Sequence, residues 1–399
     1  MTRKRGVCLK NRTTRHLSIY YFFVFCGIGG VFPLLSVYFD QELHLSGTEI
    51  GTIMSIGPVI TLLLQPIWGL ICDYTRKPKT VLTATLILTG LVGMLYLLAN
   101  DYLWLLFIAG FLAVFQSAII PISDSISVSY TQKIRADYGS IRLWGALGFA
   151  FSAFFMGKIS EWTGLKVIFI CLAFSLLTGA LLVRKMPDSG GEFQVDLRSG
   201  LRDLMKIPKF VLFIFATFLI FGPVQGNNVY FGLLIGQLGG SIVGIGAAFL
   251  VAAGTEAPFM RLCGPWIRKR GFLLVTLLAA LVSCLRWFFY FLEPDVMLVY
   301  VSTIAQGFSV GLFIPAALSY VKHISPDEVT ATAVSLYSAA GTGLGNWFCV
   351  FFGGLLLDAF NISAVYLFYG VMTFAGVCLL GVIMKMEKRE TIVGRAEAL

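Results

Sequence analysis

Long runs of apolar residues, separated by short polar segments, follow one another along almost the whole chain. A helix needs about 20 mainly apolar residues to cross the roughly 30 Å hydrocarbon core of a bilayer, and the runs reach this length. They therefore predict an all-α membrane protein. The twelve spans that we expect are residues 17–39, 48–72, 79–99, 103–130, 138–159, 164–183, 209–236, 241–261, 271–292, 296–320, 330–357 and 364–384.

One polar and charged segment, residues 184–208, is much longer than the other connections and follows the sixth predicted span. It divides the spans into two sets of six. The pattern therefore predicts an N-terminal six-helix bundle at residues 1–183, a cytoplasmic linker at 184–208, and a C-terminal six-helix bundle with a short cytoplasmic tail at 209–399.

The two predicted bundles resemble each other at an offset of about 195 residues. Gly69 in the second span matches Gly264, which follows the eighth span, and each is followed four residues later by a charged residue, Asp73 or Arg268. Parallel repeats of six spans are an architecture of secondary transporters, in which the substrate binds near the middle of the bilayer where the repeats meet. The repeat therefore favours a transporter that works by alternating access.

The composition agrees with lipid as the surrounding medium. Only 13% of the residues are charged and 57% are apolar, whereas a soluble domain carries about 25% charged residues. Of the 30 lysines and arginines, 27 fall on one side of the predicted membrane, which accounts for the net charge of +9 without nucleic acid. Because cytoplasmic loops hold this basic excess, we expect a multi-pass protein of the cell membrane with both termini in the cytoplasm.

The segment from Gly69 to Lys79 carries a family resemblance. It resembles the cytoplasmic signature loop between spans two and three of the major facilitator superfamily, although Arg76 stands where the family usually has a second glycine. The resemblance implies the major facilitator fold and a loop that latches one conformation, since its carboxylate can meet a helix N-terminus or a basic neighbour. A plain basic cytoplasmic loop is the alternative. The residues implied in the latch are Gly69, Asp73, Arg76, Lys77, Gly264 and Arg268.

The stretch from Tyr138 to Phe149 resembles one branch of that superfamily, which includes the lactose permease, the nucleoside–proton symporters and the phenylpropionate permeases. Asp124 precedes Arg142 by 18 residues, the spacing at which an acid and an arginine hold the sugar in lactose permease. The resemblance implies a substrate clamp, in which the carboxylate accepts hydrogen bonds and the guanidinium donates them. A structural salt bridge between neighbouring helices is the alternative.

Two aromatic residues of the same stretch are further candidates for the substrate site. Phe149 matches the position at which lactose permease stacks a tryptophan on its substrate, and Trp144 lies in the same motif. Both are equally suited to ordinary packing between helices. The change from tryptophan to phenylalanine disfavours a sugar as the substrate.

Ionisable residues inside the spans are functional candidates, because each costs about 2.5–3.5 kcal/mol or more at the bilayer centre. Of the 21 acids, only Asp124 and Glu256 lie deep within predicted spans. Arg286 aligns with an intramembrane arginine of lactose permease, but Gln306 and Ser309 stand where that permease carries its histidine and coupling glutamate. The proton coupling of lactose permease therefore does not carry over to this chain.

We expect Glu256, ahead of Asp124, to carry the proton. A coupling group must gain and lose its proton as the site opens to each side, and removing a carboxyl from water favours its protonated form. Glu256 lies among apolar residues, and Pro258 beside it allows the helix to bend. Asp124 differs, because a neighbouring Arg142 favours the charged form. An ion pair with Arg261 is the alternative role for Glu256.

Two amides in the seventh span, Asn227 and Asn228, are expected at the depth of Arg286 in the outer half of the membrane. Amides suit hydrogen bonds to a substrate, and they equally suit bonds between helices. We therefore count Asn227, Asn228 and Arg286 as candidates for substrate binding.

The function that these observations favour is proton-coupled uptake of a small organic solute by secondary active transport. Proton-driven export is the alternative on the same fold, and a non-transporting solute sensor is an alternative of another class. An enzyme is not expected, because the sequence shows no metal-ligand cluster, nucleophile–histidine pair or phosphate-binding loop. We expect no cofactor and no metal, a monomer, and only the substrate and the lipid bilayer as partners.

Overall fold

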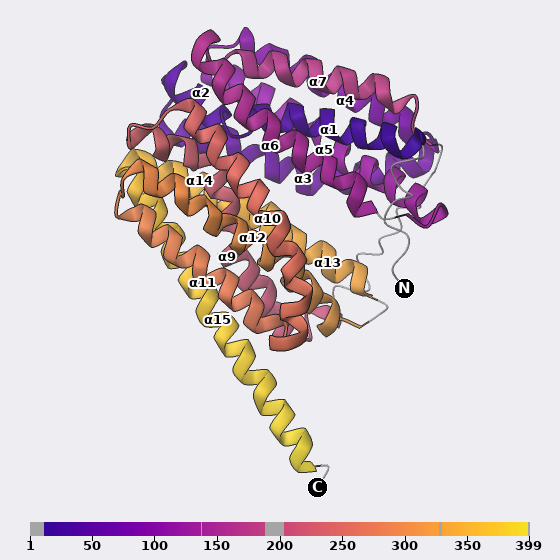
Figure 1. The fold of residues 1–399 in the computed structure, drawn as a ribbon, viewed down its shortest axis with the longest axis vertical. Coiled ribbons are helices and arrows are strands. Elements are labelled where there is room, and N and C mark those ends of the chain that lie inside the picture. The colour runs from indigo at the N-terminus through magenta and orange to yellow at the C-terminus, as the bar shows by residue number, and fades with distance from the viewer. Residues whose placement is uncertain (1–11, 137, 188–202, 327–328, 398–399) are drawn as a thin grey trace. The chain divides into compact units, whose positions relative to one another are not determined.

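The structure is a computed structural model that describes residues 12–136, 138–187, 203–326 and 329–397 (Figure 1). Within these ranges the chain is almost entirely helical and holds no β-strand. It forms two compact units, Met1–Gln194 with Phe231–Leu250 and Val195–Tyr230 with Val251–Leu399. The change of unit near residue 194 falls in the predicted linker, of which residues 188–202 lie outside the described ranges. The grouping of 231–250 with the first unit was not expected.

The helices before the predicted linker follow the apolar runs closely. They are α1 (Arg12–Val31), α2 (Leu35–Gln41), α3 (Gly47–Thr75), α4 (Pro78–Met94) with the short η2 (Leu95–Leu97), α5 (Tyr102–Lys133), α6 (Tyr138–Thr163) and α7 (Val167–Val183).

The helices after the linker repeat this arrangement. They are α9 (Pro208–Gln237), α10 (Ile242–Arg270), α11 (Phe272–Phe291), α12 (Val296–Ile324), α13 (Thr330–Ser338), the π-helical η4 (Ala339–Gly345), α14 (Asn346–Ala359) and α15 (Ile362–Glu397).

All twelve predicted spans coincide with helices. Eleven helical segments of the described chain are long and apolar enough to cross a membrane, and α7 is a twelfth apolar helix with 17 residues. The expected span 17–39 is interrupted by a turn between α1 and α2, and the span 330–357 contains η4. Helix α15 runs 36 residues, well past residue 384, and projects beyond the other helices of its unit (Figure 1). Its polar end is rich in lysine and glutamate, which are good helix formers.

Local signals set where α3 begins and ends. Ser46 is its N-cap: Ser46 Oγ accepts from the backbone N–H of Glu49 at 3.3 Å, and the Glu49 carboxylate accepts from the N–H of Ser46 at 2.9 Å. This reciprocal capping box satisfies two donors that the first turn leaves unpaired. At the other end the N–H of Arg76 donates to the carbonyl of Cys72 at 2.9 Å. Pro78 then opens α4, at a position that needs no backbone donor.

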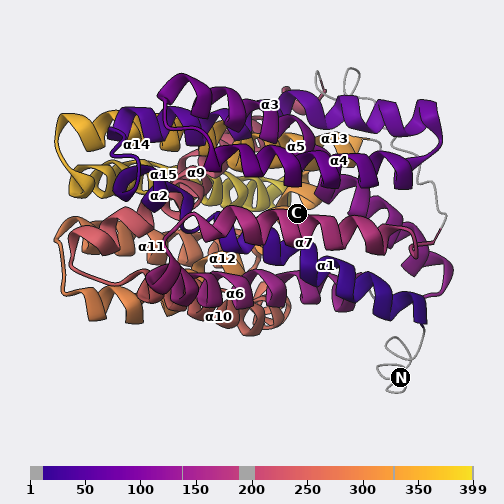
Figure 2. The same ribbon diagram turned by 90° about the horizontal axis from the view of Figure 1, so that it is seen from above.

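Helix α1 contacts both α6 and α7, and the three run side by side in the first unit (Figure 2). Glycines allow the backbones of α1 and α6 to approach each other: a Cβ at Gly148 would meet the backbone of Phe22, and one at Gly29 would meet the backbone of Phe149. Transmembrane helices gain van der Waals contact in this way, because lipid gives no hydrophobic driving force between them. The glycines therefore fix the distance between α1 and α6.

We expect Gly148→Ala to lower the temperature of thermal unfolding in detergent, with a cost of about 1–3 kcal/mol, because the backbone of Phe22 cannot move out of the way. The matched control is Gly381→Ala in α15, where no atom lies within 4 Å of the added Cβ. That variant should unfold at the same temperature or slightly higher. Equal unfolding temperatures for Gly148→Ala and the parent protein would contradict the packing argument.

Candidate functional site

Asp124 and Arg142, the two residues expected to pair, lie together in the first unit. Arg142 Nε on α6 is 3.8 Å from Asp124 Oδ1 on α5. This distance is longer than a hydrogen bond. The two charges attract each other, but the carboxylate accepts no hydrogen bond from the guanidinium. Each side chain keeps 34% of its surface exposed. Because a charge facing lipid is costly, we infer that this surface faces water.

Two aromatic residues of α1 surround the pair. The Tyr21 hydroxyl donates to Asp124 Oδ1 at 2.6 Å. The guanidinium carbon of Arg142 lies 4.2 Å from the centre of the Phe25 ring and 5.7 Å from that of Tyr21, within the range of cation–π attraction. Tyr21 and Phe25 were not among the candidates, because nothing in an aromatic-rich span distinguishes them from lipid-facing neighbours.

The structure separates the two aromatic candidates of α6. Phe149 is half-buried and follows Arg142 by seven residues, which is about two helical turns, so the two side chains share a side of α6. Trp144 follows Arg142 by two residues and therefore points about 200° away from it. It lies on the same side as the exposed Phe151. The structure therefore does not bring Trp144 to the pair.

Arg286 and Asn227 are joined in the second unit by Gln306. The Gln306 Oε1 atom accepts a hydrogen bond from Arg286 Nη1 at 2.9 Å and one from Asn227 Nδ2 at 3.5 Å. The Tyr366 hydroxyl donates to Asn227 Oδ1 at 3.1 Å. Arg286 is only 4% exposed and Asn227 only 1%. The sequence singled out Gln306 merely as a departure from the permease pattern, and the structure identifies it as the neutral partner of Arg286.

Two other polar residues do not join this cluster. Asn228 is half-buried and forms no hydrogen bond with another residue of the described chain. The Ser309 hydroxyl donates to the carbonyl of Ala305 in its own helix at 2.9 Å. The hydroxyl of Ser309 is therefore satisfied within its own helix, whereas Asn228 keeps its hydrogen-bonding groups available within the described chain.

Glu256 lies in α10, two residues before Pro258, which stands inside the helix. It is half-buried and forms neither a hydrogen bond nor an ion pair with any residue in the part of the chain that is described. The alternative ion pair with Arg261 is therefore not formed. The backbone carbonyl of Glu256 packs against α12 at Gly311.

Comparison with known proteins identifies the family of the chain. Residues 14–368 match the model of the MFS_1 like family. The chain belongs to this family. It is a multi-pass membrane transporter of the major facilitator superfamily and not an enzyme, as the sequence predicted.

Two relatives match this MFS_1-like transporter over nearly its whole length. The maltose permease of Geobacillus stearothermophilus is 46% identical over 371 residues, which cover 93% of this chain and 94% of the relative. The uncharacterized transporter YwbF of Bacillus subtilis (strain 168) is 42% identical over 375 residues, or 94% of each chain. Among solved structures, the nucleoside transporter NupG superposes with a TM-score of 0.81 at 16% identity, covering 95% of this chain and 100% of that chain. This last likeness shows the fold alone.

The predicted latch of the transporter lies at the cytoplasmic ends expected for α3 and α10. Arg76 ends α3 with a φ of 52°, and Gly271, which stands 195 residues later, follows α10 with a φ of 83°. Both angles lie in the left-handed region that glycine adopts without strain. Gly271 in the second half therefore stands at the position that Arg76 occupies in the first half. Asp73 is exposed and forms no ion pair within the described ranges, so its latching role stays a prediction. Of the other latch residues Gly69 is buried, and Lys77, Gly264 and Arg268 are exposed.

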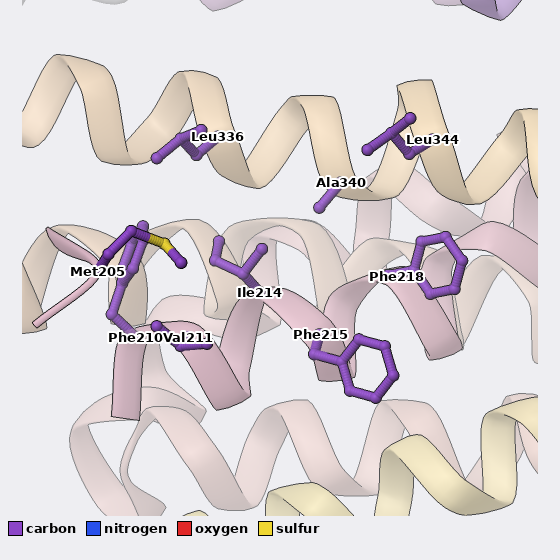
Figure 3. A pocket seen from close by; sticks show the side chains of 9 residues that line it. All are labelled: Met205, Phe210, Val211, Ile214, Phe215, Phe218, Leu336, Ala340 and Leu344. Atoms are coloured by element: carbon purple, nitrogen blue, oxygen red, sulfur yellow. The ribbon is translucent and has the colours of Figure 1, made fainter. Parts of the chain in front are cut away.

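An apolar groove of about 380 Å³ lies between α9 and the segment formed by α13 and η4 (Figure 3). The nine side chains that line it are all apolar, and they include Phe210, Phe215 and Leu344. A groove without hydrogen-bonding groups cannot orient a polar solute. We therefore place the candidate substrate site of the transporter at the Asp124–Arg142 pair and not in this groove.

Proposed function

We propose that this transporter is a proton-coupled uptake carrier for a disaccharide of the maltose type, in the cell membrane with both termini in the cytoplasm. The observation that carries the proposal is the Asp124–Arg142 pair, whose side chains are one-third exposed within a mainly apolar helix bundle. Sugar hydroxyls both donate and accept hydrogen bonds. A carboxylate beside an unengaged guanidinium supplies an acceptor and several donors at one place.

The substrate class rests on the likeness to the maltose permease, at 46% identity over 93% of the chain. The replacement of a tryptophan by Phe149 argued against a sugar. That argument is weaker than the likeness, since a phenylalanine ring still offers an apolar face to the ring of a sugar. Phe149 shares a side of α6 with Arg142, which supports a stacking role for it.

Of the remaining candidates for substrate binding, the proposal keeps one and leaves out three. Asn228 remains in the proposal as a substrate ligand, because its amide is half-buried and unbonded within the described chain. Asn227 and Arg286 are left out of the substrate contact, because they are 1% and 4% exposed and engage Gln306. Trp144 is left out because it points away from Arg142.

Proteoliposomes that contain the purified transporter test the proposal. With an inward-directed proton gradient, radiolabelled maltose should accumulate inside above its outside concentration. Collapse of the gradient with a protonophore should remove the accumulation but leave equilibration. If maltose and related disaccharides neither accumulate nor equilibrate, or if the gradient drives them outward only, the proposal is wrong.

The clamp predicts the behaviour of the charged pair. Asp124→Asn and Arg142→Ala should each weaken maltose binding more than tenfold by calorimetry, which is at least 1.4 kcal/mol, while the protein stays folded in the membrane. The double exchange Asp124→Arg with Arg142→Asp should likewise insert into the membrane, but it should not transport. The matched control is Asp203→Asn, which breaks an exposed ion pair with Lys206 and should leave binding unchanged. Transport by the exchanged pair would favour a purely structural salt bridge.

Glu256 is the proposed proton carrier, because it is a half-buried carboxyl that no cation of the described chain neutralises. Glu256→Gln resembles the permanently protonated state. This variant should lose maltose accumulation driven by a pH gradient, yet still exchange labelled for unlabelled maltose. The control Asp101→Asn, at an exposed acid, should accumulate maltose normally. Accumulation by Glu256→Gln under an imposed pH difference would rule Glu256 out as the coupling residue.

A further inference from the structure

Arg286 is a cation sealed within the second unit. Its side chain belongs to α11, and the residue is 4% exposed. The guanidinium carbon lies 4.4 Å from the centre of the Trp287 ring and 5.7 Å from that of Tyr290. These aromatic faces attract the cation, but they carry no net charge to balance it. The charge of Arg286 therefore depends on what else surrounds it.

The hydrogen bonds around Arg286 leave a shortage of acceptors. A carbonyl oxygen has two lone pairs, and those of Gln306 Oε1 are both used, by Arg286 Nη1 and Asn227 Nδ2. The Tyr366 hydroxyl donates to Asn227 Oδ1. Three buried donors, Arg286 Nε, Arg286 Nη2 and Trp287 Nε1, have no hydrogen-bond partner within the described chain. The cluster therefore needs an additional acceptor.

The cluster also needs a negative charge. Within the described residues no carboxylate forms an ion pair with Arg286. Glu293, which follows in the same segment, is bonded to Ser363 instead. An arginine does not release its proton inside proteins, so the positive charge persists. Water could satisfy the three donors, but it could not neutralise the charge.

We propose that Arg286, together with the indole N–H of Trp287, forms a binding site for a small monovalent anion, and that the ion is chloride. One negative charge balances the one guanidinium, and a spherical acceptor can receive hydrogen bonds from several donors at once. We assign a small ion rather than a larger organic anion because Arg286 is only 4% exposed. The site lies in the second unit and is separate from the Asp124–Arg142 pair. It holds independently of which solute the transporter carries.

Thermal unfolding of the purified full-length transporter tests this site without any substrate. The parent protein should unfold about 5 °C higher in sodium chloride than in sodium gluconate of equal ionic strength, since a ligand of the folded state stabilises it. Arg286→Met should lose this difference. The matched control Arg142→Met removes an intramembrane arginine that has a carboxylate partner, and it should keep the difference. Equal unfolding temperatures of the parent protein in the two salts would overturn the proposal.

A second measurement covers the case in which Arg286→Met does not fold. Bromide scatters anomalously, and crystals of the parent protein grown in bromide should show an anomalous peak at the guanidinium of Arg286. Thermal unfolding in sodium acetate tests whether the site prefers an inorganic ion or the carboxylate of a solute. Stabilisation by acetate but not by chloride would overturn the chloride assignment, as would the absence of a bromide peak at Arg286.

Discussion

The absence of water from the bilayer core is the constraint on which the rest of this structure depends. Backbone groups must satisfy one another within helices, and every charge inside a span must find an opposite charge or a polar medium. The two intramembrane arginines meet this constraint differently. Arg142 lies beside Asp124 with a third of its side chain exposed. Arg286 is sealed and bonded to a neutral amide. The first arrangement suits a solute that comes and goes, and the second suits an ion that stays.

Close packing of α1 and α6 builds the surroundings of the charged pair. A Cβ at Gly145 would lie 2.9 Å from the Phe25 ring and 3.0 Å from Arg142 Nη1, so only glycine leaves room for both. One turn later, Gly148 likewise leaves room for the backbone of α1. The glycines of this motif therefore do more than shape a helix. They bring the aromatic residues of α1 within reach of the guanidinium.

The two halves share the order of their helices but differ in the polar residues inside them. Arg76 and Gly271 follow equivalent helices and both have a positive φ, but ψ is 23° at Arg76 and 163° at Gly271. The polar residues diverged further. The first half holds a carboxylate–guanidinium pair, and the second holds a lone guanidinium with two amides. A fold maintained by helix packing tolerates such divergence, because the repeated contacts are apolar and the functional groups occupy few positions.

The sequence by itself determined the twelve helices, because the length of an apolar run depends on the solvent and not on the neighbouring helices. It also determined the candidates Asp124, Arg142, Arg286 and Glu256, since charges are rare in spans. Only the tertiary structure decided which residues meet. In the structure Trp144 points away from Arg142, Gln306 accepts a hydrogen bond from Arg286, and Glu256 forms no ion pair with Arg261. These outcomes depend on the rotation of each helix about its axis and on the identity of its neighbours, which are set by packing between residues far apart in the chain.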